Sequence, residues 1–293
     1  MLKKQKADIF ISFDGVCSLT AKIPQCLFIN DLSFLEKNTF LKRSYANYYK
    51  RNTPKFLKKA ETILTNSITL KEKIASRYQT GASKIHVIYA AASEIFQPVN
   101  DPQKTRTKGK FAEGKEYFLY SGTIHSGNNL INLLKGFSLF KKRLQSGMKL
   151  VFVRRYNEMD KSFTENLKKY KYRNDVIIID KLDEKELPNI VASAYAMIYS
   201  PLSNDLAIPV FESMQCNTPV MASSKTFTRE FADDAVIYFD GDNPDDIGEK
   251  MMLLYKDEDR RKQLIEKSRN IINEYNWNKT ADILWQCIEK TVK

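Results

Sequence analysis

Short runs of apolar and β-branched residues alternate along this chain with longer amphipathic segments, and this alternation constrains the fold more than any other feature. Strands are predicted at 8–12, 26–29, 62–65, 84–88, 117–121, 149–153, 176–179, 196–200, 219–223 and 236–239. Helices are predicted at 41–59, 129–144, 160–170, 183–193, 209–215, 227–231, 244–255, 258–274 and 278–291. Ser67 is predicted to be the N-cap of a further helix that reaches Tyr78. Strands that alternate with helices form parallel sheets covered on both faces. The sequence therefore predicts an α/β protein with Rossmann-like sheets.

One polar stretch, FQPVNDPQKTRTKGKFAEGK at 96–115, interrupts this rhythm and has the composition of a linker. We therefore predict a partial N-terminal domain at 1–97, a linker at 98–115 and a second domain at 116–275 with about six parallel strands. Residues 276–293 are predicted to form a helix that packs back on the first domain through Trp277 and Trp285, which lie on one helical face. Ligands of such sheets bind at the carboxyl ends of the strands, which points to the loops after 121, 153, 179, 200 and 223.

The amino-acid composition indicates which metals, partners and cellular compartment to expect for this chain. The four cysteines have no C-x-x-C spacing and there are only two histidines, so we expect reduced thiols, no zinc site and no histidine-rich metal site. No apolar run approaches a membrane span and the N-terminus does not read as a signal peptide, so we expect a cytoplasmic protein. The net charge of +12 favours an anionic small ligand or an anionic membrane face, or is only the surface of a lysine-rich chain. Because the lysines are spread along most helices, we expect no nucleic-acid partner.

Several stretches resemble one known family: YSGTIHSGNNLINLLKGFSLF (120–140), LPNIVASAYAMIYSPLSNDLAIPVFESMQCNTPVMAS (187–223), REFADDAVIYFDGDNPDDIGEKMMLL (229–254) and YNWNKTADILWQCIEK (275–290). They resemble the group 1, family 4-like, retaining glycosyltransferases of the GT-B fold, as do residues 28–35 and 60–98. The resemblance implies a GT-B fold of two Rossmann-like domains, of which the first is incomplete here. It also implies transfer of a hexose from a nucleotide-diphosphate sugar to a saccharide or lipid-linked acceptor, with retention and without a metal cofactor.

The resemblance places the donor diphosphate at the loop after the first strand of the second domain. Gly122 and Thr123 match this loop, but the family's basic pair falls on Gly127 and Asn128. Asn128 is therefore the polar side chain left at the position of a cation. A helix N-terminus after such a loop favours anions in any case.

The family's E-x7-E motif falls on the stretch from Asn204 to Glu212. Glu212 matches the second glutamate, which is expected to accept hydrogen bonds from ribose hydroxyls; the alternative is a surface acid in a helix first turn. Asn204 stands for the first glutamate, and the Gly-Phe-Gly between them falls on 205–207. The glycine of a C-G-T-P-V turn is Asn217.

Two arginines follow the second strand of that domain, where the family has a glycine. Arg154 and Arg155 lie where the strand is expected to point at the ligand. A guanidinium pairs well with phosphate, so these arginines are our candidates to replace the missing cations. The alternative is that both are solvated loop residues.

In the first domain, the family's His-Asp pair appears as Asn30 and Asp31. Together with Asn204 they are our candidates for the catalytic positions beside the transferred sugar. The replaced motif residues also support a second hypothesis, a catalytically inactive relative that kept the fold as a binding or partner protein. We further expect a homodimer or a partner chain to cover the open edge of the shortened first sheet, and a place at the inner face of a membrane.

Overall fold

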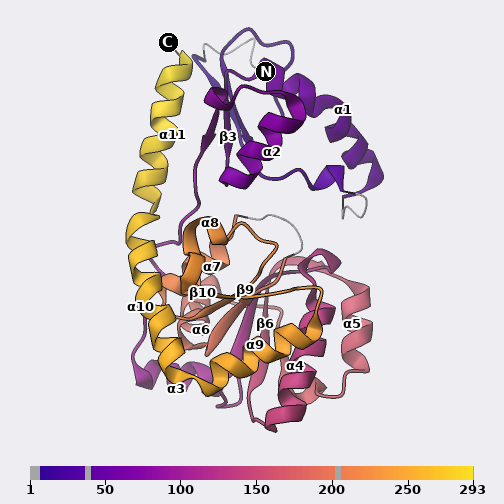
Figure 1. Ribbon diagram of the computed structural model, residues 1–293, viewed down its shortest axis with the longest axis vertical. Coiled ribbons are helices and arrows are strands. Elements are labelled where there is room, and N and C mark those ends of the chain that lie inside the picture. The colour runs from indigo at the N-terminus through magenta and orange to yellow at the C-terminus, as the bar shows by residue number, and fades with distance from the viewer. Residues whose placement is uncertain (1–6, 37–40, 202–205, 293) are drawn as a thin grey trace. The chain divides into compact units, whose positions relative to one another are not determined.

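The computed structural model describes residues 7–36, 41–201 and 206–292, which form two compact units (Figure 1). The first unit comprises the described residues up to Ala90, Leu206, and the described residues from Tyr275 onward. The second comprises 91–201 and Ala207–Glu274. Residues 91–97, which we assigned to the first domain, thus belong to the second unit.

The first unit is built on a parallel sheet with the strand order β1-β2-β3-β4. Its elements are β1 (Phe10–Ser12), β2 (Gln25–Ile29), α1 (Arg43–Lys59), β3 (Thr62–Thr65), α2 (Ile68–Tyr78), β4 (Ile85–Val87) and α11 (Trp277–Val292). Alternate residues of each strand point to opposite faces of the sheet. Leu27 and Ile63 therefore pack among residues of α1 and α2, whereas Cys26 and Leu64 pack with Cys287 of α11.

The second unit has six parallel strands in the order β10-β9-β8-β5-β6-β7, which confirms the predicted number and direction. Its strands are β5 (Tyr117–Ile124), β6 (Lys149–Met159), β7 (Val176–Ile179), β8 (Ala196–Tyr199), β9 (Val220–Ser223) and β10 (Val236–Phe239). Its helices are α3 (Asp101–Phe111), α4 (Leu130–Leu144), α5 (Lys161–Lys168), α6 (Leu187–Ser193), α7 (Ile208–Gln215), α8 (Arg229–Ala232), α9 (Pro244–Lys256) and α10 (Glu258–Glu274).

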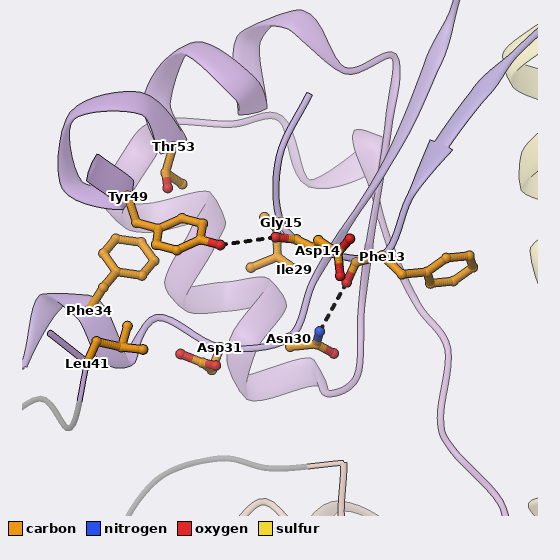
Figure 2. Close-up of a pocket in the computed structure, with 10 residues that line it drawn as sticks. All are labelled: Phe13, Asp14, Gly15, Ile29, Asn30, Asp31, Phe34, Leu41, Tyr49 and Thr53. Atoms are coloured by element: carbon orange, nitrogen blue, oxygen red, sulfur yellow. Dashed lines mark hydrogen bonds between the residues drawn. The ribbon is translucent and has the colours of Figure 1, made fainter. Parts of the chain in front are cut away.

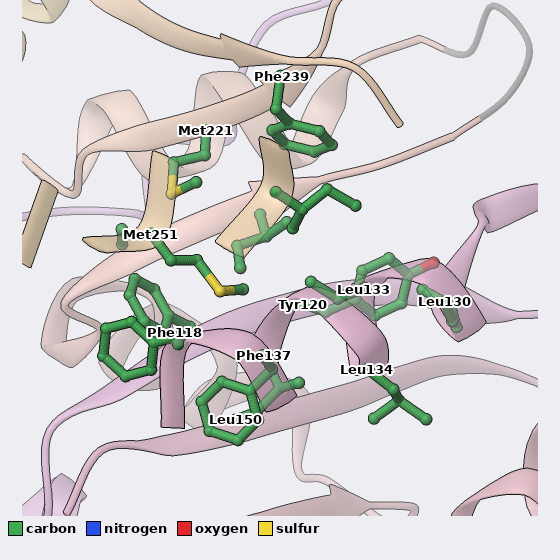
Figure 3. Packing of buried hydrophobic residues seen from close by; sticks show 14 of the residues in the cluster. Phe118, Tyr120, Leu130, Leu133, Leu134, Phe137, Leu150, Met221, Phe239 and Met251 are labelled. Atoms are coloured by element: carbon green, nitrogen blue, oxygen red, sulfur yellow. The ribbon is translucent and has the colours of Figure 1, made fainter. Parts of the chain in front are cut away.

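Helices cover both faces of this sheet. On one face, Phe118, Tyr120, Leu150 and Phe239 pack against α4 and α9, whose apolar sides meet over the strands (Figure 3). On the other face, the Tyr117 hydroxyl donates a 2.5 Å hydrogen bond to a carbonyl of α6. A sheet covered on both faces leaves the carboxyl ends of its strands as the place for a ligand.

The segment that we predicted to be a linker contains a helix. Asn100 caps α3 by accepting a hydrogen bond from the Gln103 amide at 3.0 Å, and Pro102 lies in the first turn, where proline is tolerated. Lys110 pairs with Glu186, which directly precedes α6, at 3.0 Å. The prediction of a linker at 98–115 was wrong because a proline in the first turn does not break a helix and the exposed Gly109 only weakens it.

Helix α11 packs on the sheet of the first unit, but not through its tryptophans. Cys287 and Thr291 are buried, and the Thr291 hydroxyl lies 2.5 Å from that of Thr62 in β3. Trp277 and Trp285 are 48% and 62% exposed. The tryptophans do share a face, but it is the outward one, because the buried face carries the smaller residues that fit closely against the strands.

All four cysteines are free and buried, as expected. Among the described residues, no helix has the length and apolar content needed to cross a membrane. The described part of β1 pairs only with β2, and the expected partner at that edge stays a prediction.

Candidate functional site

The loop after β5 carries Gly122, Thr123 and Asn128, and hydrogen bonds within the unit hold it closed. The Thr123 carbonyl accepts from the Tyr120 hydroxyl at 2.6 Å and from the Asn128 side chain at 2.7 Å. Asn128 Nδ2 also lies 3.0 Å from the Thr123 hydroxyl. A Cβ at Gly122 would lie 3.0 Å from the Tyr120 hydroxyl, so glycine here makes room for this bond. The structure therefore brings the three predicted residues together.

The backbone amides of this loop are also engaged. The Gly127 amide donates to Nδ1 of His125 at 2.9 Å, and the Asn128 amide donates to the His125 carbonyl at 3.0 Å. Free amides at such a position would bind an anion. In this conformation the amides of Gly127 and Asn128 donate to His125 instead of to an anion.

Arg155 and Glu212, which are 57 positions apart, form an ion pair. Nη2 of Arg155 donates to Oε1 of Glu212 at 2.6 Å, and the side chains are only 19% and 5% exposed. Strand β6 runs on to Met159, beyond the predicted end at 153, and places Arg155 beside the middle of α7. Glu212 is therefore not the surface acid of the alternative interpretation.

The other carboxylate oxygen of Glu212, Oε2, is buried, and no described residue donates a hydrogen bond to it. Burial raises the pKa of Glu212, and the charge and hydrogen bond of Arg155 oppose that rise. A buried acceptor without a donor is costly unless a ligand or water supplies one. Oε2 is thus the atom of this site with unused capacity to accept a hydrogen bond.

Arg154 lies at an open groove of about 760 Å³ formed where β7 ends beside the middle of β6. Its Nε lies 3.0 Å from Oδ1 of Asp180, which follows β7 directly. The groove also contains Arg155, Lys181 and the side chains of Ile95 and Phe96. Both candidate arginines are therefore paired with carboxylates and are not merely solvated.

The loop after β7 is one of the predicted ligand loops, but none of its residues was a predicted site residue. Asp180 and Lys181 could have been found from their place immediately after a predicted strand. Ile95 and Phe96 could not, because nothing in their local pattern indicates which strand they approach.

The backbone before α7 keeps a glycine-like conformation without glycine. Ala207 has a φ of 52°, and Asn217, where the family has the glycine of its turn, has a φ of 56°. These left-handed values are unfavourable for alanine by about 1 kcal/mol and less so for asparagine. The turn geometry thus survives the loss of the glycines. The expected role of Asn204 lies outside the described residues.

In the first unit, Asn30 and Asp31 line a pocket of about 290 Å³ at the carboxyl ends of β1 and β2 (Figure 2). Asn30 donates to the Phe13 carbonyl at 3.3 Å, and Asp31 accepts from the Ser33 amide at 2.6 Å. The structure therefore brings this predicted pair into one pocket. Whether it faces the transferred sugar stays a prediction.

Helix α1 completes this pocket with Tyr49 and Thr53, which the sequence interpretation missed. The Tyr49 hydroxyl donates to the Asp14 carbonyl at 3.4 Å (Figure 2). Oδ1 of Asn30 and the hydroxyl of Thr53 are buried, and neither has a hydrogen-bond partner among the described residues. The spacing of four residues puts Tyr49 and Thr53 on one helical face, and this was the only sequence signal for them.

No cluster of three or more His, Cys, Asp or Glu side chains suited to a metal ion occurs in the described part of the chain. The cations that the described residues bring to the second-unit site are Arg154, Arg155 and Lys181.

Two Rossmann-like units with polar groups at the carboxyl ends of their strands define a GT-B type fold. The profile of the family described as "Glycosyl transferases group 1" matches residues 101–271, which is more than half of the chain. The chain belongs to this family. The match includes the segment of α3 that we had assigned to a linker.

Two curated relatives are O-antigen enzymes by name. The chain is 25% identical over 239 residues to "O-antigen chain mannosyltransferase RfbU" of Salmonella typhimurium, covering 79% of this chain and 61% of that protein. It is 20% identical over 249 residues to "O-antigen chain mannosyltransferase B" of Escherichia coli, covering 85% of this chain and 65% of that protein. The chain thus spans less than two thirds of either relative.

Solved structures share the fold at low sequence identity. A glycosyltransferase from Rickettsia africae superposes with a TM-score of 0.76 at 14% identity, covering 100% of this chain and 79% of that one. Anabaena Alr3699/HepE in complex with UDP-glucose gives a TM-score of 0.78 at 12% identity, covering 97% and 78%. These similarities establish the fold.

Proposed function

We propose that this chain transfers a hexose, most specifically mannose, from a nucleotide-diphosphate sugar to a saccharide or lipid-linked acceptor with retention at the anomeric carbon. Membership of the glycosyltransferase family supports the reaction class. The names of the two curated relatives support mannose as the sugar and a growing O-antigen chain as the acceptor.

One observation carries the proposal: a buried carboxylate with one unused oxygen lies against an arginine at the ligand end of the sheet. Oε2 of Glu212 is suited to accept a hydrogen bond from a ribose hydroxyl. The Arg155 guanidinium has five N–H groups, so one bond to Glu212 leaves others for phosphate oxygens. Pairing with Glu212 therefore orients Arg155 without exhausting it.

In the proposed reaction, the bond between the anomeric carbon and the phosphate oxygen breaks and a bond to an acceptor oxygen forms on the same face. The acceptor hydroxyl gives its proton to the leaving phosphate oxygen as negative charge develops on the diphosphate. Arg154 and Arg155 stabilise that charge, assisted by Thr123 and Asn128, so no metal is required. Asn30, Asp31 and Asn204 are the proposed contacts of the transferred sugar.

A second candidate function is a relative that binds but does not catalyse. The observation that favours it is the loop after β5, where His125 occupies the amides of Gly127 and Asn128. The Arg154–Asp180 pair points in the same direction. A donor must replace these contacts before the diphosphate is held.

The test is calorimetry with GDP, UDP and ADP on the wild type and on Arg154→Ala and Glu212→Gln, with Arg143→Ala as control. Arg143 belongs to an exposed pair with Glu249 at 3.7 Å, so its loss changes one charge outside the site. We expect micromolar binding of one nucleotide, weakened about ten- to a hundredfold by Arg154→Ala but unchanged in the control.

Two other outcomes are informative. Millimolar or weaker binding of all three nucleotides, together with no hydrolysis or transfer from the sugar donors, favours the non-catalytic relative. Micromolar binding that survives both site variants shows that the donor lies elsewhere.

A further inference from the structure

Helix α1 differs in charge from the rest of the chain. Its 17 residues, RSYANYYKRNTPKFLKK, include six lysines and arginines and no acidic residue. The whole chain carries a net charge of +12. One helix therefore carries a net charge of +6, half of the total, although lysines are also spread along most of the other helices.

These basic groups face outward. The buried side of α1 consists of Ala46, Thr53, Phe56 and Leu57. The exposed basic residues are Arg43, Lys50, Arg51, Lys55 and Lys58. Within the described residues, none of them has a carboxylate within 4.0 Å. Their charge is therefore available to an external partner.

Two tyrosines extend the same surface. Tyr45 and Tyr48 are 59% and 48% exposed. Residues 45, 48, 51, 55 and 58 are three or four positions apart, so the tyrosines continue the row of Arg51, Lys55 and Lys58 along the helix. Tyrosine rings are enriched where one end of a side chain meets lipid and the other meets water.

We propose that the outer face of α1, defined by Tyr45, Tyr48, Arg51, Lys55 and Lys58, docks on the surface of a bilayer that contains anionic lipids. The basic side chains supply the attraction to lipid phosphates and the tyrosines enter the headgroup layer. A row of charges along one convex helix can meet a flat surface along its whole length. Single-stranded nucleic acid, in contrast, is bound in a groove that tracks its backbone.

This surface adjoins the pocket of the first unit through the helix itself. Tyr49 and Thr53 of α1 line the pocket that contains Asn30 and Asp31. A bilayer on the outer face of α1 would lie one helix diameter from that pocket, about 10 Å. The docked surface would thus present a lipid-linked acceptor to the pocket, a consequence that rests on the proposed function.

The experiment is flotation with vesicles of phosphatidylcholine alone or with about one third phosphatidylglycerol, without any nucleotide. We compare the wild type with the triple variant Arg51→Gln, Lys55→Gln, Lys58→Gln. The matched control is Lys135→Gln, Lys142→Gln, Lys256→Gln, which removes the same charge from exposed positions of α4 and α9. Far-ultraviolet circular dichroism and melting curves verify that each variant is folded.

We expect the wild type to float only with anionic vesicles and to be released at about 0.5 M salt. Each basic residue near the surface contributes about fivefold, so the α1 variant should bind about a hundredfold more weakly and the control less than about threefold. Tyr45→Ser should weaken binding in a salt-independent manner.

The proposal is overturned if the wild type does not float with anionic vesicles, or if both triple variants lose binding equally. It is also overturned if the α1 variant loses affinity for a short oligonucleotide while vesicle binding is unchanged. Binding to anionic vesicles without sugar transfer would support membrane docking by α1 but reject the proposed function. The two claims can therefore be tested separately.

Discussion

Replacing Arg155 with alanine tests whether one ion pair holds Glu212 as a buried carboxylate. The guanidinium of Arg155 is the only group that donates a hydrogen bond to the Glu212 side chain among the described residues. Its removal leaves a carboxylate that is about 5% exposed with neither oxygen paired.

The magnitude follows from burial and distance. Two unit charges about 4 Å apart attract by about 4 kcal/mol at an effective dielectric constant near 20. Breaking a buried pair by removing one partner typically costs about 3–5 kcal/mol, because the other charge stays desolvated. We therefore expect Arg155→Ala to lower the free energy of unfolding by about 3 kcal/mol at about pH 8.

The destabilisation caused by Arg155→Ala should become smaller as the pH is lowered. Burial raises the pKa of Glu212 in the folded state, so the folded protein holds this proton more tightly than the unfolded chain. The resulting stability is fully present below the unfolded pKa and is lost as the pH rises through the folded pKa. The charge and hydrogen bond of Arg155 lower the pKa of Glu212. Without Arg155 this pKa rises further, so the protonated form of Glu212 persists to higher pH in the folded variant. At about pH 5 a larger fraction of Glu212 should be protonated in the variant than at about pH 8, so the cost of removing Arg155 should be at least about 1 kcal/mol smaller.

The assay is urea denaturation of the wild type, Arg155→Ala and Arg155→Ala/Glu212→Gln at both pH values. The double variant removes the unpaired charge and should recover most of the loss at about pH 8. Arg143→Ala, which breaks an exposed pair, should change stability by less than about 0.5 kcal/mol. A cost below about 1 kcal/mol at pH 8, or one that is equal at both pH values, would refute the reasoning.

Two further predictions concern packing. Cys287→Asp should lower the free energy of unfolding by about 3 kcal/mol or more in urea denaturation, because it buries a carboxylate where α11 contacts the sheet. Trp285 is exposed, so Trp285→Ala should lower it by less than about 1 kcal/mol. Equal losses would contradict the observed orientation of the helix. Gly136→Ala should lower the free energy of unfolding by about 1–3 kcal/mol, because its Cβ would lie 2.7 Å from Ile247 of α9. A Cβ at Gly109 would have no described atom within 4 Å, so Gly109→Ala should stabilise the protein by about 0.5–1 kcal/mol. A neutral Gly136→Ala would show that α4 and α9 separate freely.

Much of the local structure was predictable because it depends on neighbours in the sequence. Each of the ten predicted strands is present, and Ser67 caps α2 by accepting a hydrogen bond from the Leu70 amide. The same kind of signal, Asn100 followed by Pro102, indicates the start of α3, whereas the polar composition of the segment indicates a linker. The periodicity of α11 also placed Trp277 and Trp285 on one face correctly, but periodicity does not state which face is buried.

The sequence by itself determined the two parallel sheets and the ends at which ligand groups gather, because strand alternation and covering helices follow from hydrophobic period alone. Only the tertiary structure decided which charges meet. Arg155 and Glu212 come from β6 and α7, and their pairing depends on how far β6 extends and on which turn of α7 lies beside it. An ion pair requires atoms within about 4 Å, and spacing along the chain does not define such distances between separate elements.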